Sequence, residues 1–194
     1  MNEAEAYEGL RPHLQSLGLD PQRIENVLSK GTPDVWYAGG AIEMKYLEEW
    51  PAFSSTPVRI RTLVDRPQQV AWLWRRWTCG GPAWVMVRID RQYLLFAAPD
   101  ARAVRNGLPR ERLLKTAVWM TDVHGRGDFQ ELRSWLLWKD EELPPPQRAK
   151  LLRLICNQTV EEAATILRVN PEEVERGETV ECLTTNDLID AWVA

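Results

Sequence analysis

Two short runs of β-favouring residues, separated by Gly39-Gly40, constrain the fold of this chain more than any other feature. The runs cover residues 34–38 and 41–47, and a glycine pair between two such runs predicts a hairpin with a tight turn. In the second run apolar residues alternate with Glu43 and Lys45. Alternate residues of a strand share a face. The apolar residues should therefore meet a core, and Glu43 and Lys45 should point together to the other side.

The same hairpin predicts a pair of neighbouring carboxylates. Asp34 opens the first run, so pairing across the turn brings it beside Glu43. Two adjacent carboxylates repel each other unless a cation lies between them, and Mg²⁺ prefers oxygen ligands. A divalent ion lowers the pKa of a bound water and stabilises charge on a phosphate under attack, and Lys45 is placed to orient that water. The pattern indicates metal-dependent phosphodiester hydrolysis.

The surrounding sequence predicts a mixed α/β fold, with a central sheet flanked by helices. The order of elements reads helix, strand, strand, helix, strand, strand. The expected segments are helices over 3–17, 21–28 and 68–77, an extended run over 59–64, the hairpin above, and a second hairpin over 83–89 and 93–98.

A proline-rich linker over 141–146 divides the chain into two predicted domains, 1–140 and 147–194. The second domain is expected to be helical, and residues 159–176 resemble a helix-turn-helix. Its second helix, 172–176, carries three glutamates that would face phosphates. Protein binding or dimerisation therefore suits this appendage better than reading DNA.

Motifs around the hairpin resemble the PD-(D/E)XK nuclease superfamily. The sequence Gly31-Thr32-Pro33-Asp34 is followed after eight residues by Glu43-Met44-Lys45. The segment 23–26, with an acidic residue on a predicted helix, the glutamine-bearing helix 67–73, and Gly80-Gly81 before two strands sharpen the resemblance. They point to the VRR-NUC-like branch, which includes small phage proteins and is similar to Holliday-junction resolvases. The resemblance covers roughly residues 20–98 and implies a restriction-endonuclease-like sheet.

The resemblance also implies roles for individual residues. Asp34, Glu43 and the main-chain carbonyl of Met44 would bind Mg²⁺ or Mn²⁺, and Lys45 would position or activate water. Glu25 would complete the metal shell, directly or through water.

The glutamine helix contributes one more expected site residue. Gln69 would steady the site or touch a phosphate, and Gln68 is the alternative. The spacing to Trp72-Leu73 favours Gln69.

Charge is spread unevenly along the chain. The net charge is -4, but residues 51–110 hold ten arginines against three aspartates, a balance of +7, between two acidic ends. A polyanion site is therefore expected in the middle segment. The candidates for contact with nucleic acid are Arg75, Arg76, Arg88, Arg91 and, for stacking on an unpaired base, Trp74. The alternative is that these side chains are merely solvated ends of a helix and a turn.

Several classes of protein are not expected. No run of 18 apolar residues is present, so no membrane span is expected. The first seven residues are acidic and polar, unlike a signal peptide. The three cysteines form no CxxC pair, which counts against a disulfide framework or a zinc ribbon. These features favour a cytoplasmic protein, in a bacterial host if the chain is phage-encoded.

The sequence thus favours a metal-dependent DNA endonuclease that selects branched or junction DNA in phage replication or recombination. A homodimer is plausible because a resolvase must cut two strands. The main alternative is a catalytically silent nuclease-fold protein that binds DNA or a protein partner. A sequence-specific DNA binder that uses the C-terminal helices is a third interpretation.

Overall fold

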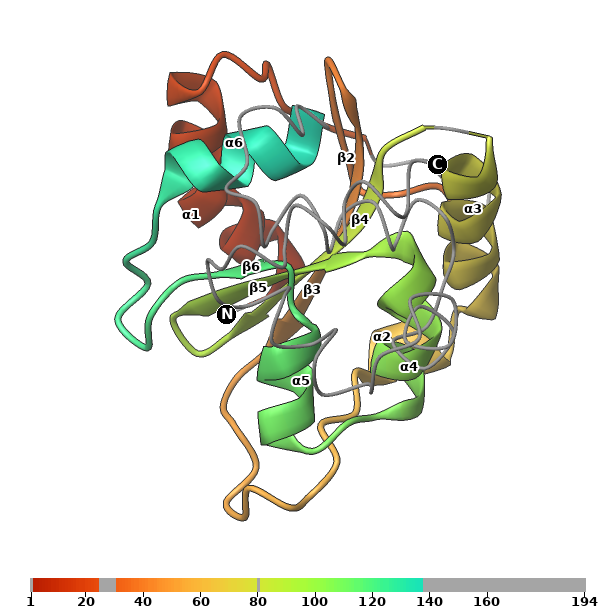
Figure 1. Cartoon of the computed structure of the whole chain (residues 1–194), viewed down its shortest axis with the longest axis vertical. Coiled ribbons are helices and arrows are strands. Elements are labelled where there is room, and N and C mark those ends of the chain that lie inside the picture. Colours follow the sequence, from red (N-terminus) through yellow and green to blue (C-terminus); the bar gives the residue numbers. More distant parts are fainter. Residues whose placement is uncertain (1, 25–30, 80, 138–194) are drawn as a thin grey trace, which may run out of the picture. The chain divides into compact units, whose positions relative to one another are not determined.

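The computed structural model describes residues 2–24, 31–79 and 81–137, which form a mixed α/β fold (Figure 1). The expected order of helix, hairpin, helix, hairpin is confirmed, with shorter elements added around it. The elements are α1 (Glu3–Ser16), β1 (Gln22–Arg23), β2 (Val35–Tyr37), β3 (Gly40–Leu47), α2 (Arg61–Val64), α3 (Pro67–Thr78), β4 (Ala83–Ile89), β5 (Gln92–Ala97), the 3₁₀ turn η1 (Ala98–Asp100), α4 (Ala101–Asn106), α5 (Arg110–Thr116), β6 (Trp119–Met120) and α6 (Phe129–Leu137).

Among the described residues, six strands form one sheet, in the order in which they occur along the chain. Each neighbouring pair is antiparallel except β3 and β4, which are parallel from Ala41↔Ala83 to Leu47↔Ile89. A parallel pair needs a crossover connection, and α3 lies in that connection. The two central strands therefore run side by side with α3 packed next to them.

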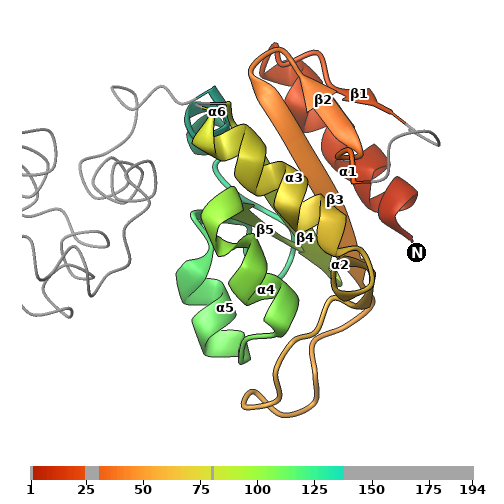
Figure 2. The same cartoon turned by 90° about the vertical axis from the view of Figure 1, so that its right-hand side faces the viewer.

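Helices cover both faces of the central strands. Figure 2 shows α1 on one side of the sheet and α3, α4 and α5 on the other. On the α1 side, the Tyr93 hydroxyl donates to the Ala6 carbonyl at 3.0 Å. The α6 helix packs beside α1, where His13 and Phe129 stack with their ring centroids 3.9 Å apart. Because both faces are covered, the first six residues of β3 are all buried.

Tryptophans fill the junction between the helices and β4. Trp84 is fully buried and packs edge-on against Trp77 of α3 and Trp135 of α6. Its indole N–H donates to the Tyr37 hydroxyl at 3.0 Å, and that hydroxyl donates to the Leu136 carbonyl. This cluster fixes α3 and α6 to the start of the parallel strand pair.

Two expected elements are wrong. The helix predicted from Pro21 is replaced at Gln22–Arg23 by the short strand β1, which pairs with Val35 and Trp36 of β2. Asp20 adopts a positive φ of 43°, which turns the chain back along the sheet edge.

The extended run predicted over 59–64 is instead the single helical turn α2. Val58 makes an isolated bridge to Leu108, and no strand of the described sheet pairs with residues 59–64. The segment therefore joins β3 to α3 as a helical turn.

The described residues up to Leu137 form one compact unit. The predicted C-terminal domain 147–194, with its helix-turn-helix-like segment, lies outside the described residues. Among the helices that the structure describes, none has the length and apolar character required to cross a membrane.

Candidate active site

The site begins where β2 leaves the edge of β3. Their pairing ends at Val35↔Ile42, so the next outward-facing N–H of β3, that of Met44, has no strand partner there. It donates instead to the Asp34 carboxylate at 3.3 Å. The Asp34 carbonyl accepts from the Ile24 N–H at 2.8 Å, which ties the residue to the segment after β1. Asp34 is thereby held against β3 by its side chain and its backbone together.

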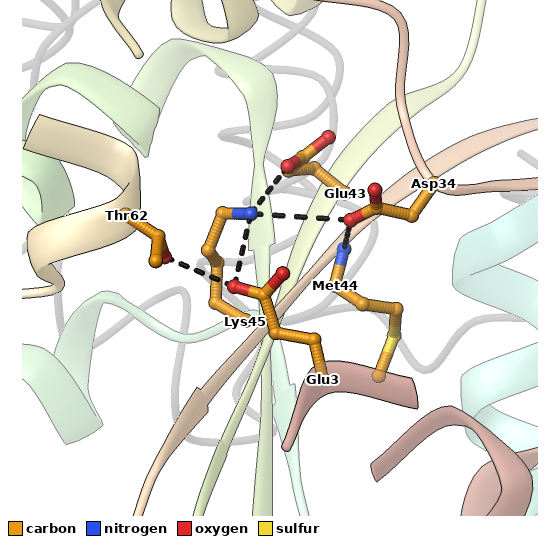
Figure 3. Close-up of polar contacts among 6 residues, drawn as sticks. All are labelled: Glu3, Asp34, Glu43, Met44, Lys45 and Thr62. Atoms are coloured by element: carbon orange, nitrogen blue, oxygen red, sulfur yellow. Dashed lines mark hydrogen bonds and ion pairs between the residues drawn. The ribbon is translucent and has the colours of Figure 1, made fainter. Parts of the chain in front are cut away.

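Three carboxylates, from α1, from the loop before β2 and from β3, surround the ammonium of Lys45 (Figure 3). Its Nζ donates to Glu43 Oε1 at 2.5 Å and to Glu3 Oε1 at 3.3 Å, and it lies 3.9 Å from Asp34 Oδ2. Glu43 and Lys45 are both fully buried, although they point away from the apolar residues of β3. The expectation that Asp34, Glu43 and Lys45 come together is confirmed, and their burial is greater than strand alternation alone would suggest.

Glu3 is a site residue that the sequence analysis missed. It lies in the first turn of α1, and the Thr62 hydroxyl of α2 donates to the same Oε1 at 3.0 Å. The only local signal was the capping box formed by Asn2 and Glu5, which starts the helix at Glu3. A capping box locates the start of a helix, but it does not predict which strand that end of the helix will contact. We use the name carboxylate cluster for Glu3, Asp34, Glu43 and Lys45.

Burial and like charges govern the pKa values in this cluster. Burial, with Asp34 and Glu3 nearby, raises the pKa of Glu43 to about 8, although Lys45 opposes the shift. Burial also raises the pKa of Asp34, again against Lys45. Burial alone would lower the pKa of Lys45, but Glu43, Asp34 and Glu3 outweigh it, so the net shift is upward. One ammonium is therefore not enough to neutralise the carboxylates beside it.

Glu43 Oε2 and Gln69 Oε1 are among the buried polar atoms of the described residues that lack a hydrogen-bond partner. Gln69 is buried in line with Leu73 and Trp77 on the inner side of α3. An unsatisfied buried acceptor is costly, so both atoms are suited to a ligand or water between α3 and β3. A contact between Gln69 and the carboxylate cluster is not among the interactions seen in the described part of the chain.

The loop that carries Asp34 rests on the first turn of α3. Gly31 has a φ of +97°, and a Cβ added to it would meet the Gln68 carbonyl oxygen at 2.9 Å. This close approach sets the position of the glutamine helix relative to Asp34.

The predicted nucleic-acid residues lie in three different places. Arg75, Arg76 and Trp74 are exposed on α3, and Arg91 is exposed at the β4–β5 turn. Arg88 is on the face of the sheet opposite Lys45, because its register partner is Tyr46. Its guanidinium donates to the Asp90 carbonyl at 2.8 Å and lies 5.2 Å from the centre of the Tyr93 ring. Arg88 is thus engaged within the fold. Contact of these residues with nucleic acid stays a prediction.

The predicted metal ligands are only partly found together. Glu25, the expected further ligand, lies outside the described residues. Within residues 2–24, 31–79 and 81–137, no three His, Cys, Asp or Glu side chains converge in the way that a metal ion requires. The carboxylates of Asp34 and Glu43 would therefore need main-chain or solvent oxygens to complete a shell.

Comparison of the chain with family models, with curated proteins and with solved structures finds no match in any of the three. The site is accordingly interpreted from its own residues.

Proposed function

We propose that this protein is a metal-dependent nuclease that hydrolyses phosphodiester bonds in DNA at the carboxylate cluster. The observation that carries the proposal is the charge of this cluster. Three carboxylates share the single buried ammonium of Lys45. With all groups ionised, the balance is two negative charges, which one divalent cation would neutralise.

The donor atoms suit a hard cation such as Mg²⁺ or Mn²⁺. Asp34 and Glu43 would hold it, and Glu43 Oε2 is an acceptor without a hydrogen-bond partner. The Met44 carbonyl is a third donor, because the N–H and C=O of a strand residue point to the same edge and the Met44 N–H faces Asp34. Glu25 remains the proposed further ligand.

When bound, the ion would activate a water molecule and stabilise charge on the phosphate. Lys45 is suited to orienting the attacking water, since its Nζ lies between the two proposed ligand carboxylates. Glu3 contacts the same Nζ and is held by Thr62. Glu3 would therefore fix the direction of the ammonium, while Gln69 would steady the site from α3.

The order of elements supports a restriction-endonuclease-like fold within this proposal. A helix, a hairpin bearing the acidic residues, a crossover helix and a parallel strand occur in that order around the site. The further expectations are a preference for branched DNA, a homodimer, a protein partner for the C-terminal segment and a cytoplasmic location. They rest on the motifs described above.

A catalytically silent DNA- or protein-binding protein is the second candidate. It is favoured by the short contact between Lys45 and Glu43, which partly satisfies the cluster without a metal. It is disfavoured because burial of Glu43, whose Oε2 has no hydrogen-bond partner, costs stability, and a silent protein would gain no function from that cost.

Cleavage separates the two candidates. We would incubate the full chain with a four-way junction, a flap, a nicked duplex and single-stranded DNA, each in Mg²⁺ and in EDTA. We expect the wild type to cleave in Mg²⁺ and not in EDTA. The cleavage rate should fall by a factor of roughly 100 or more in Asp34→Ala and in Lys45→Ala. Glu8→Ala, at an exposed acidic residue of α1 that pairs with Arg11, is the control. Cleavage of none of the substrates, or wild-type cleavage by both site variants, would contradict the nuclease proposal.

A further inference from the structure

The loop between β3 and α2, residues 48–60, is joined to the site at both ends. It leaves β3 at Leu47, two residues after Lys45, and it returns at α2, where Thr62 bonds Glu3. Figures 1 and 2 show the loop projecting beyond the end of the sheet. Both ends of the loop are therefore close to the carboxylate cluster.

This loop is held in place by the segment that precedes and begins α5. The Val58 N–H donates to the Leu108 carbonyl at 2.8 Å, and the Arg110 N–H donates to the Ser54 carbonyl at 3.1 Å. The Arg110 guanidinium also lies over the Trp50 ring, 4.6 Å from its centre. Three contacts along its length fix the conformation of the loop.

The side chain at its outer turn is nevertheless apolar and exposed. The Thr56 N–H closes a turn onto the Phe53 carbonyl at 3.0 Å, and Phe53 is 74% exposed. No other large apolar residue among those the structure describes is as exposed. An anchored loop that presents an aromatic ring to solvent is suited to stacking on a planar group.

The loop and the residues that follow it also carry exposed positive charge. Arg59, Arg61 and Arg66 are exposed, and none of them forms an ion pair within the described part of the chain. Asp65 is the only acidic residue between positions 50 and 66. Exposed arginines on the same segment as an exposed aromatic ring match a phosphate backbone with an unstacked base, whereas an apolar protein surface would leave these guanidinium groups uncompensated.

We propose that residues 48–66, which comprise the loop, α2 and the N-cap residue of α3, form the surface that holds the nucleic-acid strand beside the carboxylate cluster. Phe53 stacks on an unpaired base, and Arg59, Arg61 and Arg66 bind phosphates. This inference rests on the proposed nuclease function and names its substrate feature: a strand with at least one unpaired base next to the cleaved bond.

Binding in the absence of cleavage tests this proposal separately from catalysis. We would measure fluorescence anisotropy of the full chain in EDTA, with a labelled oligothymidylate and with a blunt duplex of equal length. Phe53→Ala is expected to weaken binding of the oligothymidylate about tenfold and to change duplex binding little, since stacking is available only to unpaired bases. Phe53→Trp should retain binding. Val123→Ala, at an exposed apolar residue of another loop, is the matched control.

The arginines are tested through the salt dependence of the same binding. Log affinity falls with log salt, and the steepness of this fall should decrease by about 0.7 to 0.9 in each of Arg59→Ala, Arg61→Ala and Arg66→Ala. Substitution of the same arginines by lysine keeps the charge and should leave the steepness unchanged. Arg11→Ala is the control, on α1 eight residues beyond Glu3.

Unchanged affinity for both probes in Phe53→Ala and in the three arginine variants would overturn the proposal, and so would no binding by the wild-type chain. The first result would leave the loop to a protein partner. Loss of cleavage with intact loop-dependent binding would contradict the nuclease function alone.

Discussion

At the scale of single residues, the charge balance around Lys45 is the central physical fact. A fully buried ammonium is stable here because three carboxylates lie within 4.0 Å of its Nζ. The carboxylates are less well compensated, because burial, together with the charges of Asp34 and Glu3, raises the pKa of Glu43 to about 8 against the effect of Lys45. The free energy of unfolding of the metal-free protein should therefore depend on pH.

We predict that the unfolding free energy of the metal-free protein falls as the pH is raised from about 5 to 8. In this window folded Glu43 retains a proton that the unfolded chain, with an ordinary value of 4.5, has released. The folded state binds more protons, so its stability falls with rising pH, by at most about 1.4 kcal/mol per pH unit from this group. Lys45 has no part in this window, because its raised pKa acts only above its ordinary value of 10.5.

Urea denaturation in EDTA across this pH range is the measurement. Glu43→Gln should flatten most of the slope, and the remainder should come from Asp34, whose pKa is also raised. A slope that is equal in the wild type and in Glu43→Gln would contradict this view of Glu43.

The pairing of Asp34, Glu43 and Lys45 could be predicted because a hairpin and strand alternation are local rules. Glu3 could not be predicted, because its place depends on how α1 packs across the sheet. The burial of Glu43 and Lys45 was equally hidden. Their burial depends on α3, which covers the second face of the sheet. Strand alternation assigns residues to a face but does not predict whether a helix covers that face.

At the scale of elements, the site depends on three segments meeting at the place where β2 diverges from β3. The α1 helix supplies Glu3, the loop before β2 supplies Asp34, and β3 supplies Glu43 and Lys45. The loop with Asp34 is positioned by the contact of Gly31 with the first turn of α3. The glycine is thus a structural requirement of the site as well as of the turn.

We predict that Gly31→Ala destabilises the protein by about 1–3 kcal/mol and lowers cleavage more than stability alone explains. A Cβ would meet the Gln68 carbonyl, and alanine disfavours the positive φ. Gly18→Ala is the matched control, because Gly18 has a φ of +72° but open space around its Cβ position. It should show the conformational strain without loss of cleavage. Equal effects of the two substitutions on cleavage would refute the positioning role of Gly31.

The stronger elements of the sheet were predictable from periodicity, but the short ones were not. The helix α3 and the strands β3, β4 and β5 have long apolar patterns with clear turn signals. The strand β1 has two residues and exists only because β2 offers an edge. The turn α2 forms where no strand of the described sheet pairs with residues 59–64. Pairing decisions of this kind are tertiary, and local propensity does not encode them.

At the scale of the whole molecule, the uneven charge of the chain acquires a spatial meaning. Three acidic residues of the N-terminal segment lie around Lys45, while Arg59 lies on the adjoining loop, Arg61 on α2 and Arg66 at the N-cap of α3. The hydrogen bond from Thr62 to Glu3 joins the acidic segment to the basic one, although the net charge of -4 gives no hint of this. A cation held by the first would face a polyanion held by the second.

The binding of a divalent ion to the carboxylate cluster is the central claim of this account. Isothermal titration calorimetry of the full chain with Mg²⁺ and Mn²⁺ tests it most directly, with Asp34→Asn, Glu43→Gln and Asp65→Asn measured alongside. We predict saturable binding of an ion by the wild type and by Asp65→Asn, and a loss of affinity of about tenfold or more in both site variants. Absence of binding to the wild type, or equal affinity in all four proteins, would contradict it.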